Sequence, residues 1–285
     1  LMHNKKLKRK TRIIFFVVLT ISIIFAVIIY KYEKKEKEDL LKQVEAAIEP
    51  EKNLYEVGQP DEKGTSLIYT LSDRLDEVNI ENMIIADNWK SNGVFYSTWR
   101  KENVVFENGI MSLLVNHDQE QGETPWSSAE YFTKDFTQYG EYRVRMKPIK
   151  NNGVISSFFV YTGPGYGYPW DEIDIEFLGK DTTIVQFNYY TNGEGKHEYI
   201  YELGFDASEE FHTYGFIWEK DYIAWTVDDQ EVYRATENIP SNPAKIMMNT
   251  WVTQGVDGWT GKFDGNVPLA AKYDWIEYKA IEVEK

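Results

Sequence analysis

The sequence predicts an all-β protein, a curved two-sheet jelly-roll sandwich that is preceded by one transmembrane helix and a short charged stalk. Three observations predict this. Short runs of alternating apolar and polar residues fill the chain from about residue 76, turn residues separate them, and one uncharged apolar run lies near the N-terminus. The 285 residues suffice for one large β domain with an appendage, because all-β sandwiches often reach about 200–250 residues.

The apolar run at residues 13–30, IIFFVVLTISIIFAVIIY, has no charged residue. Its length is at the lower end for crossing a hydrocarbon core of about 30 Å. A basic tail at residues 1–12 precedes it, and basic residues stay on the cytoplasmic side. We therefore expect a single-pass protein of the cell membrane, with a cytoplasmic N-terminus and an extracellular remainder.

Two alternatives for this run remain open. A cleaved signal peptide would make the protein secreted, but its apolar region is normally about 7–15 residues long and a small-x-small site follows, whereas KYEKKEKED follows here. A buried core helix would need another segment to cover it, and we find none.

Residues 31–75 are predicted to form a charged stalk and a linker. Residues 31–49 are rich in helix formers with mixed charges, and Pro50 ends this pattern. The following residues up to about 75 contain turn residues and little periodicity.

Residues 76–285 are predicted to form the β-jelly-roll domain. Alternating runs such as residues 142–146, 183–190, 222–227 and 245–251 are separated by turn signals such as Asn192-Gly193 and Asp228-Asp229. A two-sheet jelly roll is the economical fold for such a chain. No repeat of about 20–50 residues is evident, which disfavours a propeller.

The composition excludes several classes of function. The formal net charge is −15 and no basic stripe is present, so nucleic-acid binding is disfavoured. The absence of cysteine excludes disulfides, cysteine-ligated zinc and thiol nucleophiles. The 9 Trp, 20 Tyr and 15 Phe residues exceed the needs of one core, and their flat faces suit stacking on sugars.

The segment WDEIDIEF at residues 170–177 contains the strongest functional signal. On a strand, period two places Glu172, Asp174 and Glu176 on one face and the apolar residues on the other. A solvated strand face is the bland alternative. We favour a functional site because adjacent like charges repel and because strands disfavour Asp.

Such a row of carboxyl groups can cleave a glycosidic bond, with one group protonating the leaving oxygen and another attacking the anomeric carbon or activating water. Mutual repulsion raises one pKa and keeps a proton available near neutral pH. Retention needs carboxyls about 5–5.5 Å apart, whereas Cα atoms four residues apart on a strand are about 13 Å apart. Side chains that lean inward on a concave strand would close this gap, but spacing alone leaves the question open.

The stretch from Asp171 to Glu198 closely resembles the bacterial lichenases, which are endo-β-1,3-1,4-glucanases of glycoside hydrolase family 16. YGEYRVRMKP, SSFFVYTGP and KIMMNTWV add to the resemblance, which covers about residues 83–280. It implies a concanavalin A-like jelly roll with a sugar-binding cleft on its concave face, and hydrolysis with retention through a covalent glycosyl-enzyme intermediate. It also implies that Glu172 is the nucleophile, Glu176 the general acid and then base, and Asp174 the assisting carboxylate.

The resemblance implies further site residues. The substrate-binding residues are expected to be Trp170, Tyr161, Phe159, Asn188, Tyr190, Glu130, Glu198, Asn249, Trp251, Trp259 and Asn92. Asp274 resembles a structural calcium ligand, for which backbone carbonyls would supply further oxygens. No redox or organic cofactor is expected, and we expect a monomer.

Two positions depart from the family pattern. A disulfide of the Bacillus-type enzymes aligns with Ser97 and Ser128, so this domain would lack about 2–4 kcal/mol of stabilisation unless it is compensated. A substrate-contacting arginine aligns with Phe132.

The expected function is therefore that of a membrane-tethered licheninase acting on mixed-linkage β-glucan. Alternatives are another family 16 activity, on β-1,3-glucan or xyloglucan, and a glucan-binding protein without catalysis. The single residue between Asp174 and Glu176 argues against the β-1,3 branch, whose motif usually contains a bulged extra residue. The presence of Glu172 and Glu176 argues against a binding-only role.

Overall fold

The computed structural model describes residue 35, residues 53–120 and residues 123–281. Residues from Asn53 onward form one compact unit. The predicted basic tail at 1–12, the anchor at 13–30 and nearly all of the stalk at 31–49 lie outside the described residues. Within the described ranges, no helix is long and apolar enough to cross a membrane.

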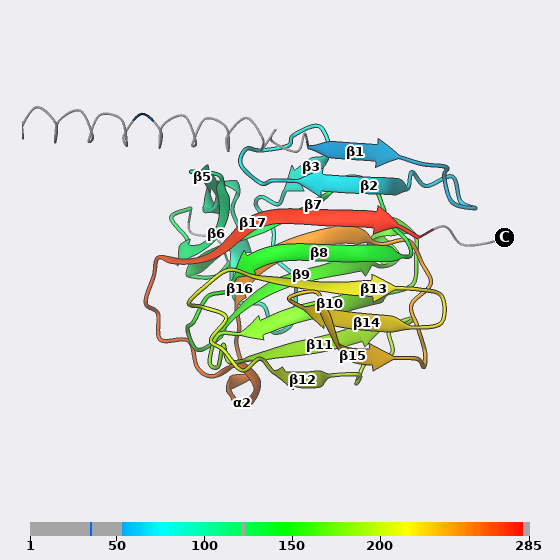
Figure 1. Cartoon of the computed structure of the whole chain (residues 1–285). Coiled ribbons are helices and arrows are strands. Elements are labelled where there is room, and N and C mark those ends of the chain that lie inside the picture. The colour runs from blue at the N-terminus through cyan, green and yellow to red at the C-terminus, as the bar shows by residue number, and fades with distance from the viewer. Residues whose placement is uncertain (1–34, 36–52, 121–122, 282–285) are drawn as a thin grey trace, which may run out of the picture. The chain divides into compact units, whose positions relative to one another are not determined.

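The compact unit is a sandwich of two antiparallel layers, as the sequence predicts (Figure 1). The outer layer runs in the hydrogen-bonded order β15 (Gln230–Ala235), β14 (Ile223–Val227), β13 (His212–Trp218), β8 (Gly140–Lys147) and β17 (Leu269–Ala280). The far side of β17 pairs with two hairpins, namely β6 (Ile110–His117) with β5 (Val104–Glu107), and β2 (Ile68–Asp73) with β1 (Leu54–Val57).

The inner layer runs in the order β12 (Tyr199–Glu202), β11 (Ile184–Tyr190), β10 (Asp171–Leu178), β9 (Val154–Thr162), β16 (Lys245–Val252), β7 (Trp126–Thr133) and β3 (Met83–Ile85). A short strand, β4 (Thr98–Trp99), pairs in parallel with β7. The short helices are η1 (Lys101–Asn103), η2 (Pro164–Tyr166) and α2 (Asp257–Thr260).

Aromatic side chains fill the space between the layers. The ring of Phe177 in β10 meets Tyr214 of β13 at 4.8 Å, and Phe187 of β11 meets Trp225 of β14 at 5.6 Å. Ile173 and Ile175 are fully buried in the same core. The predicted apolar face of β10 is thus confirmed, and the opposite face of β10 is left for the site.

The two predicted turn signals are confirmed as tight turns. Asn192 and Gly193 have φ angles of 52° and 81°, and Asp228 and Asp229, between β14 and β15, have φ angles of 46° and 63°. Positive φ at two successive residues is the geometry that matches the twist of a hairpin, and Gly, Asn and Asp tolerate it best.

The domain begins earlier than the predicted boundary at residue 76. Strands β1 and β2 lie within the predicted linker, and β2 pairs with β17 from Asp73↔Ile276 to Thr70↔Lys279. Ile68 and Leu71 of β2 are each only 1% exposed. Their spacing of three residues breaks the two-residue alternation of a strand, which is why the periodicity did not reveal β2.

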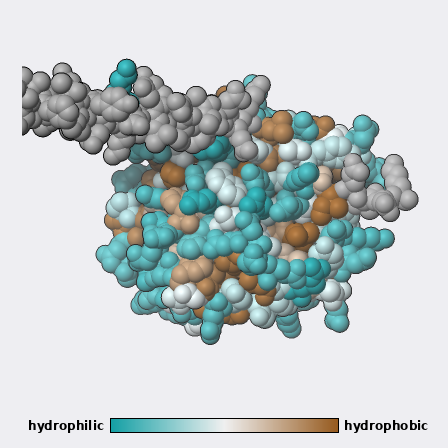
Figure 2. Space-filling model, viewed as in Figure 1, coloured by the Kyte–Doolittle hydropathy of each residue, from teal (hydrophilic) through white to brown (hydrophobic). Residues whose placement is uncertain are grey.

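The face seen in Figure 2, viewed as in Figure 1, is covered mostly by hydrophilic residues with scattered apolar ones. The outer layer lies toward the viewer in this orientation (Figure 1). The outer layer therefore buries one face against the core and exposes the other to water, as antiparallel sheets commonly do.

Candidate active site

A cleft of about 930 Å³ lies on the face of the inner layer that points away from the core. All the predicted catalytic and substrate-binding side chains line it. They are Glu172, Asp174, Glu176, Trp170, Tyr161, Phe159, Asn188, Tyr190, Glu130, Glu198, Asn249, Trp251, Trp259 and Asn92. Residues that are distant in the sequence are thus brought together, as the sequence predicts, although their roles remain predictions.

Strand register arranges the residues on this face of the inner layer into three rows that run across the strands, and all of them except Phe132 and Lys245 line the cleft. The first row is Gln186, Glu176, Ser157, Asn249 and Glu130. The second row is Asn188, Asp174, Phe159, Met247 and Phe132. The third row is Tyr190, Glu172, Tyr161 and Lys245. Each row contains one acid of β10, so a chain that lies across the strands meets a carboxyl group with polar or aromatic neighbours on either side.

Hydrogen bonds orient two of the three acids of β10. The indole Nε1 of Trp170 donates to Glu172 Oε2 at 2.6 Å, and Gln186 Nε2 donates to Glu176 Oε2 at 2.7 Å. The backbone oxygen of Asp174 accepts from Trp225 Nε1 at 3.1 Å, which ties β10 to the outer layer. The strand that bears the acids is therefore held in place by the outer layer on its core side.

Burial raises the pKa of each of these three acids. It raises the pKa of Glu172 to about 7, against the opposing hydrogen bond from Trp170 and with support from the charge of Glu176. The pKa of Glu176 rises to about 7 for the same reason, opposed by the hydrogen bond from Gln186. Burial, followed by the charges of Glu172 and Glu176, holds the pKa of Asp174 well above its usual range. The row therefore retains protons near neutral pH, which is what general acid catalysis requires.

Polar groups beside the acids are ready to bind hydroxyl groups. The buried Oδ1 atoms of Asn188 and Asn249 have no hydrogen-bond partner among the residues that the structure describes. Asn249 Nδ2 donates to Glu130 Oε2 at 3.2 Å, and burial raises the pKa of Glu130 to about 7. An unpaired buried acceptor is costly, so these amide oxygens favour a ligand that brings hydroxyl donors.

Aromatic rings form the walls of the cleft. Trp170 stacks on Tyr190 with ring centroids 4.3 Å apart, and Phe95 stacks on Trp251 at 3.8 Å. Trp259 donates from Nε1 to Gln186 Oε1 at 3.0 Å and so connects the wall to the Glu176 hydrogen bond. Such rings offer apolar faces together with polar edges, which suits sugar rings.

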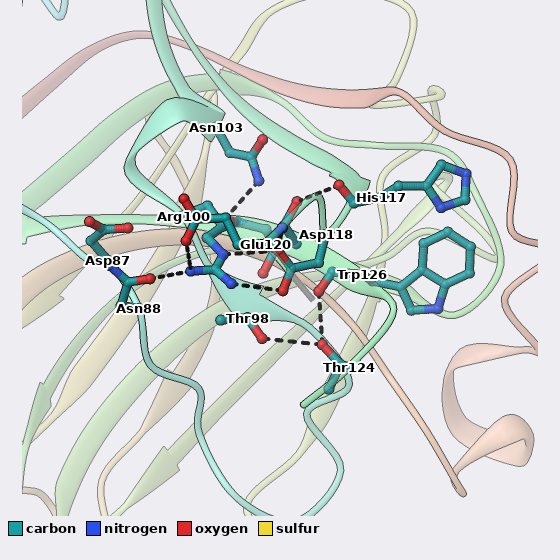
Figure 3. A network of polar contacts seen from close by, with 12 residues as sticks. Asp87, Asn88, Thr98, Arg100, Asn103, His117, Asp118, Glu120, Thr124 and Trp126 are labelled. Atoms are coloured by element: carbon teal, nitrogen blue, oxygen red, sulfur yellow. Dashed lines mark hydrogen bonds and ion pairs between the residues drawn. The ribbon is translucent and has the colours of Figure 1, made fainter. Parts of the chain in front are cut away.

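A buried arginine, Arg100, holds Asn88 (Figure 3), and the loop that follows Asn88 brings Trp89 and Asn92 to the cleft. Arg100 is 4% exposed; its Nε and Nη2 donate to the two carboxylate oxygens of Asp118 at 3.0 and 2.9 Å. Its Nη1 donates to Glu120 at 2.9 Å and to Asn88. Because paired, bidentate contacts fix geometry, Arg100 sets the position of Asn88 and of the loop that follows it.

Sequence reasoning missed several residues that line the cleft, namely Trp89, Ser91, Val94, Phe95, Ser157, Tyr166, Gln186 and Met247. Three of them could have been found, because Ser157, Gln186 and Met247 each lie two residues from a predicted site residue on the same strand. The others lie outside the regular strands, and no period places their side chains.

The two departures from the family pattern have distinct structural outcomes. The hydroxyl of Ser128 donates to that of Ser97 at 2.7 Å, and both residues are fully buried. The two positions that the resemblance assigns to a disulfide are thus in contact through a hydrogen bond. Phe132 is 8% exposed and packs in a buried apolar cluster with Phe159 and Met247, where the resemblance places an arginine.

Asp274 lies outside the cleft, at the irregularity in β17 between Tyr273 and Trp275. Its Oδ2 accepts from Arg145 Nη1 at 2.9 Å. Across the described ranges, no group of three or more His, Cys, Asp or Glu side chains gathers where it could hold a metal ion. A calcium ion at Asp274 would therefore compete with Arg145 and would depend on backbone carbonyls and water for its other oxygens.

An all-β sandwich whose cleft combines stacked aromatic rings with a row of protonatable carboxyl groups defines a glycoside hydrolase. Residues 91–277 match the family model described as glycosyl hydrolases family 16. The chain belongs to this family.

Proteins of known identity agree with this assignment. The chain is 55% identical over 190 residues to a beta-glucanase of Acetivibrio thermocellus, a match that covers 67% of this chain and 57% of that protein. It is 54% identical over 199 residues to a beta-glucanase of Paenibacillus macerans, covering 68% of this chain and 81% of the relative. The chain thus spans just over half the length of the first of these relatives.

Solved structures show the same fold. A prokaryotic beta-1,3-1,4-glucanase (lichenase) from a mouse hindgut metagenome superposes with a TM-score of 0.74 at 53% identity, covering 75% of this chain and 100% of that chain. A Bacillus licheniformis beta-glucanase superposes with a TM-score of 0.72 at 46% identity, covering 75% of this chain and 99% of the other.

Proposed function

We propose that this protein is an endo-β-1,3-1,4-glucanase, a licheninase that cuts mixed-linkage β-glucan at a β-1,4 bond following a β-1,3-linked glucose. One observation carries this proposal. Glu172, Asp174 and Glu176 stand in a row on the floor of an aromatic-walled cleft, with their pKa values raised. The similarity to proteins described as beta-glucanases and as a lichenase supports the choice of polymer.

The proposed reaction is hydrolysis with retention in two steps. In the first, ionised Glu172 attacks the anomeric carbon, the glycosidic bond breaks, and Glu176 gives its proton to the leaving oxygen. In the second, water attacks the anomeric carbon of the glycosyl-enzyme, Glu176 takes a proton from that water, and the bond to Glu172 breaks. Asp174 lies between the two, and the charge of Glu172 raises its pKa further, so its protonation depends on the charge of the nucleophile.

The cleft also accounts for binding of a neutral polysaccharide. Trp170, Tyr190 and Trp251 provide ring faces for stacking, and the unpaired Oδ1 atoms of Asn188 and Asn249 accept hydrogen bonds from hydroxyl groups. We expect no redox or organic cofactor, because acid–base and nucleophilic chemistry by carboxyl groups suffices.

We propose that the domain acts outside the cell, tethered by the apolar run at residues 13–30 and released if this run is cleaved. The basic tail at 1–12 and the uncharged run support this orientation. Fractionation of cells that express the full chain tests it: the protein should sediment with membranes and be released by detergent but not by salt. Recovery in the soluble fraction at full length would contradict the tether.

We also propose that a structural calcium ion binds at Asp274. If calcium binds there, melting of the full chain should shift upward with millimolar CaCl₂ over EGTA, and Asp274→Asn should abolish the shift. An equal melting temperature in both solutions would remove the proposal.

The activity test uses the full chain in detergent on barley β-glucan, laminarin, xyloglucan and carboxymethyl-cellulose. We expect short mixed-linkage oligosaccharides from barley glucan alone, and a loss of about 10³-fold or more in Glu172→Gln, because the nucleophile is removed. Glu202→Gln, an exposed residue outside the cleft, is the matched control and should be fully active. NMR of the first product should show the β-anomer if configuration is retained.

Other outcomes favour the alternatives. Release of products from laminarin or xyloglucan instead of barley glucan would assign a different family 16 specificity. A folded protein that binds glucan and releases nothing from any polymer would be a binding protein.

A further inference from the structure

A short loop at the rim of the cleft holds a tyrosine that no sequence pattern revealed. The loop Gly163–Tyr168 contains η2, and Tyr166 from this loop lines the cleft while 38% exposed. The Tyr166 ring meets Phe136 edge-on at 5.7 Å and Tyr161 at 6.2 Å. Tyr166 is thus partly exposed where it lines the cleft, and two aromatic rings contact it.

The loop between β1 and β2 holds this rim loop through hydrogen bonds to Tyr168. The Tyr168 hydroxyl donates to Asp61 Oδ2 at 2.5 Å and lies 2.6 Å from the hydroxyl of Thr65. Asp61 Oδ1 in turn accepts from the backbone N–H groups of Lys63 and Thr65 at 3.0 and 2.6 Å. The carboxylate therefore organises its own turn and the neighbouring loop at once.

Lys63 makes a second connection between the two loops. Its Nζ donates to the backbone oxygen of Gly167 at 3.1 Å and lies 3.8 Å from the centroid of the Tyr168 ring. A cation over an aromatic face is attractive, and both contacts lie within two residues of Tyr166.

The hairpin is itself anchored to the segment that supports Tyr166 from below. Ile68 N donates to Phe136 O at 2.7 Å, Phe136 N donates to Ser66 O at 3.2 Å, and Tyr55 donates to Asp135 at 3.0 Å. On the other side, Lys245 Nζ lies 4.6 Å from the Phe136 ring centroid. Hairpin, Phe136 and rim loop therefore form one connected support.

The hairpin precedes the segment that matches the family model. Strands β1 and β2 end at Asp73, whereas that match begins at residue 91. The contacts that hold the rim loop come from residues 61–65, so they lie before the matched segment.

We propose that Tyr166 forms an additional sugar-stacking subsite at the β16 end of the third row, and that the β1–β2 loop positions it. This inference rests on the proposed function. Lys245, whose Nζ lies 5.3 Å from the Tyr166 ring centroid, is two strands from Glu172 in that row. Adjacent strands are about 4.8 Å apart, so a glucan chain must reach about 10 Å beyond the nucleophile to use Tyr166.

Steady-state kinetics of the full chain on mixed-linkage oligosaccharides of increasing length test the subsite. The quantity to compare is the length ratio, which is kcat/KM on long substrates divided by kcat/KM on the shortest cleaved substrate. In Tyr166→Ala this ratio should fall about three- to tenfold, because one aromatic contact with long substrates is lost. The fall should come from a higher KM on the long substrates. Tyr166→Phe, which keeps the ring, should restore the ratio. An equal loss on all lengths, or no loss, would overturn the subsite.

The positioning role has its own variants. Tyr168→Phe and Asp61→Ala should lower the same length ratio, because each removes the hydrogen bond between Tyr168 and Asp61 that holds the rim loop, while Tyr166 is kept. Asp181→Ala is the matched control: Asp181 also caps its own turn, through the N–H and hydroxyl of Thr183 at 3.0 and 2.6 Å, and does not line the cleft. The role is overturned if Asp181→Ala lowers the ratio as much as Asp61→Ala does, or if neither Tyr168→Phe nor Asp61→Ala lowers it.

Binding separates failure of this inference from failure of the proposed function. Isothermal titration of the full chain bearing Glu172→Gln with the longest oligosaccharide needs no hydrolysis. About threefold or more weaker binding on adding Tyr166→Ala supports the subsite even if the wild type proves inactive, and equal affinity overturns it. A chain that binds no glucan overturns both proposals.

Discussion

The carboxyl groups of Glu172, Asp174 and Glu176 interact strongly because they stand next to one another on one face of β10, where Asp174 is buried and the two glutamates are half-buried. Burial penalises each charge, and the neighbouring charges add to the penalty for Glu172 and Asp174. The pKa values observed in a titration therefore describe the three carboxyl groups together, rather than single residues. Such coupling lets neighbouring carboxyls of similar chemistry act as nucleophile and as acid.

The proposed roles predict the pH dependence of activity. Glu172 must be ionised and Glu176 protonated, and both pKa values are about 7, so kcat/KM should follow a narrow bell centred near neutral pH. Activity should rise as Glu172 loses its proton and fall as Glu176 does.

Aryl glucosides with good leaving groups check the assignment, because their cleavage needs little acid assistance. With such a substrate, Glu176→Gln should lose the alkaline limb of the bell and keep the acid limb. Retention of both limbs would contradict the role given to Glu176.

Glu130 predicts a gain of stability from removing a charge. Its pKa is about 7 in the folded state and about 4.3 when unfolded, so the folded state binds more protons and stability falls as pH rises from about 4 to 7. Glu130→Gln should therefore be more stable than the wild type by about 3–4 kcal/mol at pH 8 and nearly equal at pH 4.

Urea unfolding at these two pH values measures the difference. The same variant should bind glucan less tightly, since Glu130 lines the cleft. A variant that is less stable than the wild type at pH 8 would show that the carboxylate is stabilised in the fold.

Among the elements, strands with strict alternation were predictable from the sequence. Residues 173, 175 and 177 face the core and residues 172, 174 and 176 the cleft, because period two leaves no other arrangement. Strand β2 was not predictable: Ile68 and Leu71 are buried at a spacing of three, and Asp73, a polar residue, is buried with them.

Residues 163–167 could be read from the sequence as a loop at the cleft rim, but the place of Tyr166 in the site could not be predicted. The position of Tyr166 depends on contacts of its loop with Lys63 and Thr65, which are 104 and 103 residues from their partners in the sequence, and on a ring contact with Phe136. No local pattern contains that information. Strand β10, by contrast, contains its own two-residue pattern, so the placement of its three acids on the cleft face was predictable.

The contact between Ser97 and Ser128 predicts that a cross-link can be introduced there. The hydroxyl oxygens are 2.7 Å apart, and a disulfide needs sulfurs about 2.05 Å apart with a suitable dihedral angle. The oxidised double variant Ser97→Cys/Ser128→Cys should gain about 2–4 kcal/mol.

Thermal melting with and without dithiothreitol measures the gain, which should raise Tm by roughly 5–12 °C in the oxidised form. The two single variants are the controls and should not respond to dithiothreitol. Failure of the double variant to oxidise would show that the two backbones are too far apart for a disulfide.

At the scale of the whole molecule, the β1–β2 hairpin is part of the outer layer rather than a linker. A chain beginning at residue 76 would leave the edge of β17 unpaired and would lose Ile68 and Leu71 from the core. Burial of one such side chain contributes about 1.5–3 kcal/mol. We expect residues 76–285 to be less stable than residues 53–285 by about 3–6 kcal/mol.

Urea midpoints of the two truncated chains provide the measurement. Equal midpoints would show that the hairpin adds no stability to the layer, in spite of its burial. Exposure of the β17 edge should also make the shorter chain more prone to association, because an unpaired edge accepts a further strand.

The hydrogen-bonded pair Ser97 and Ser128 has a consequence for the surroundings in which the domain can persist. The chain has no cysteine, and a hydroxyl pair holds the two segments that a covalent bridge would otherwise join. Thiol reductants therefore have no bond to open, and oxidants have no thiol to consume. Thiol–disulfide exchange therefore cannot change the covalent structure of this domain, and its stability should be the same in surroundings that keep thiols reduced and in those that oxidise them.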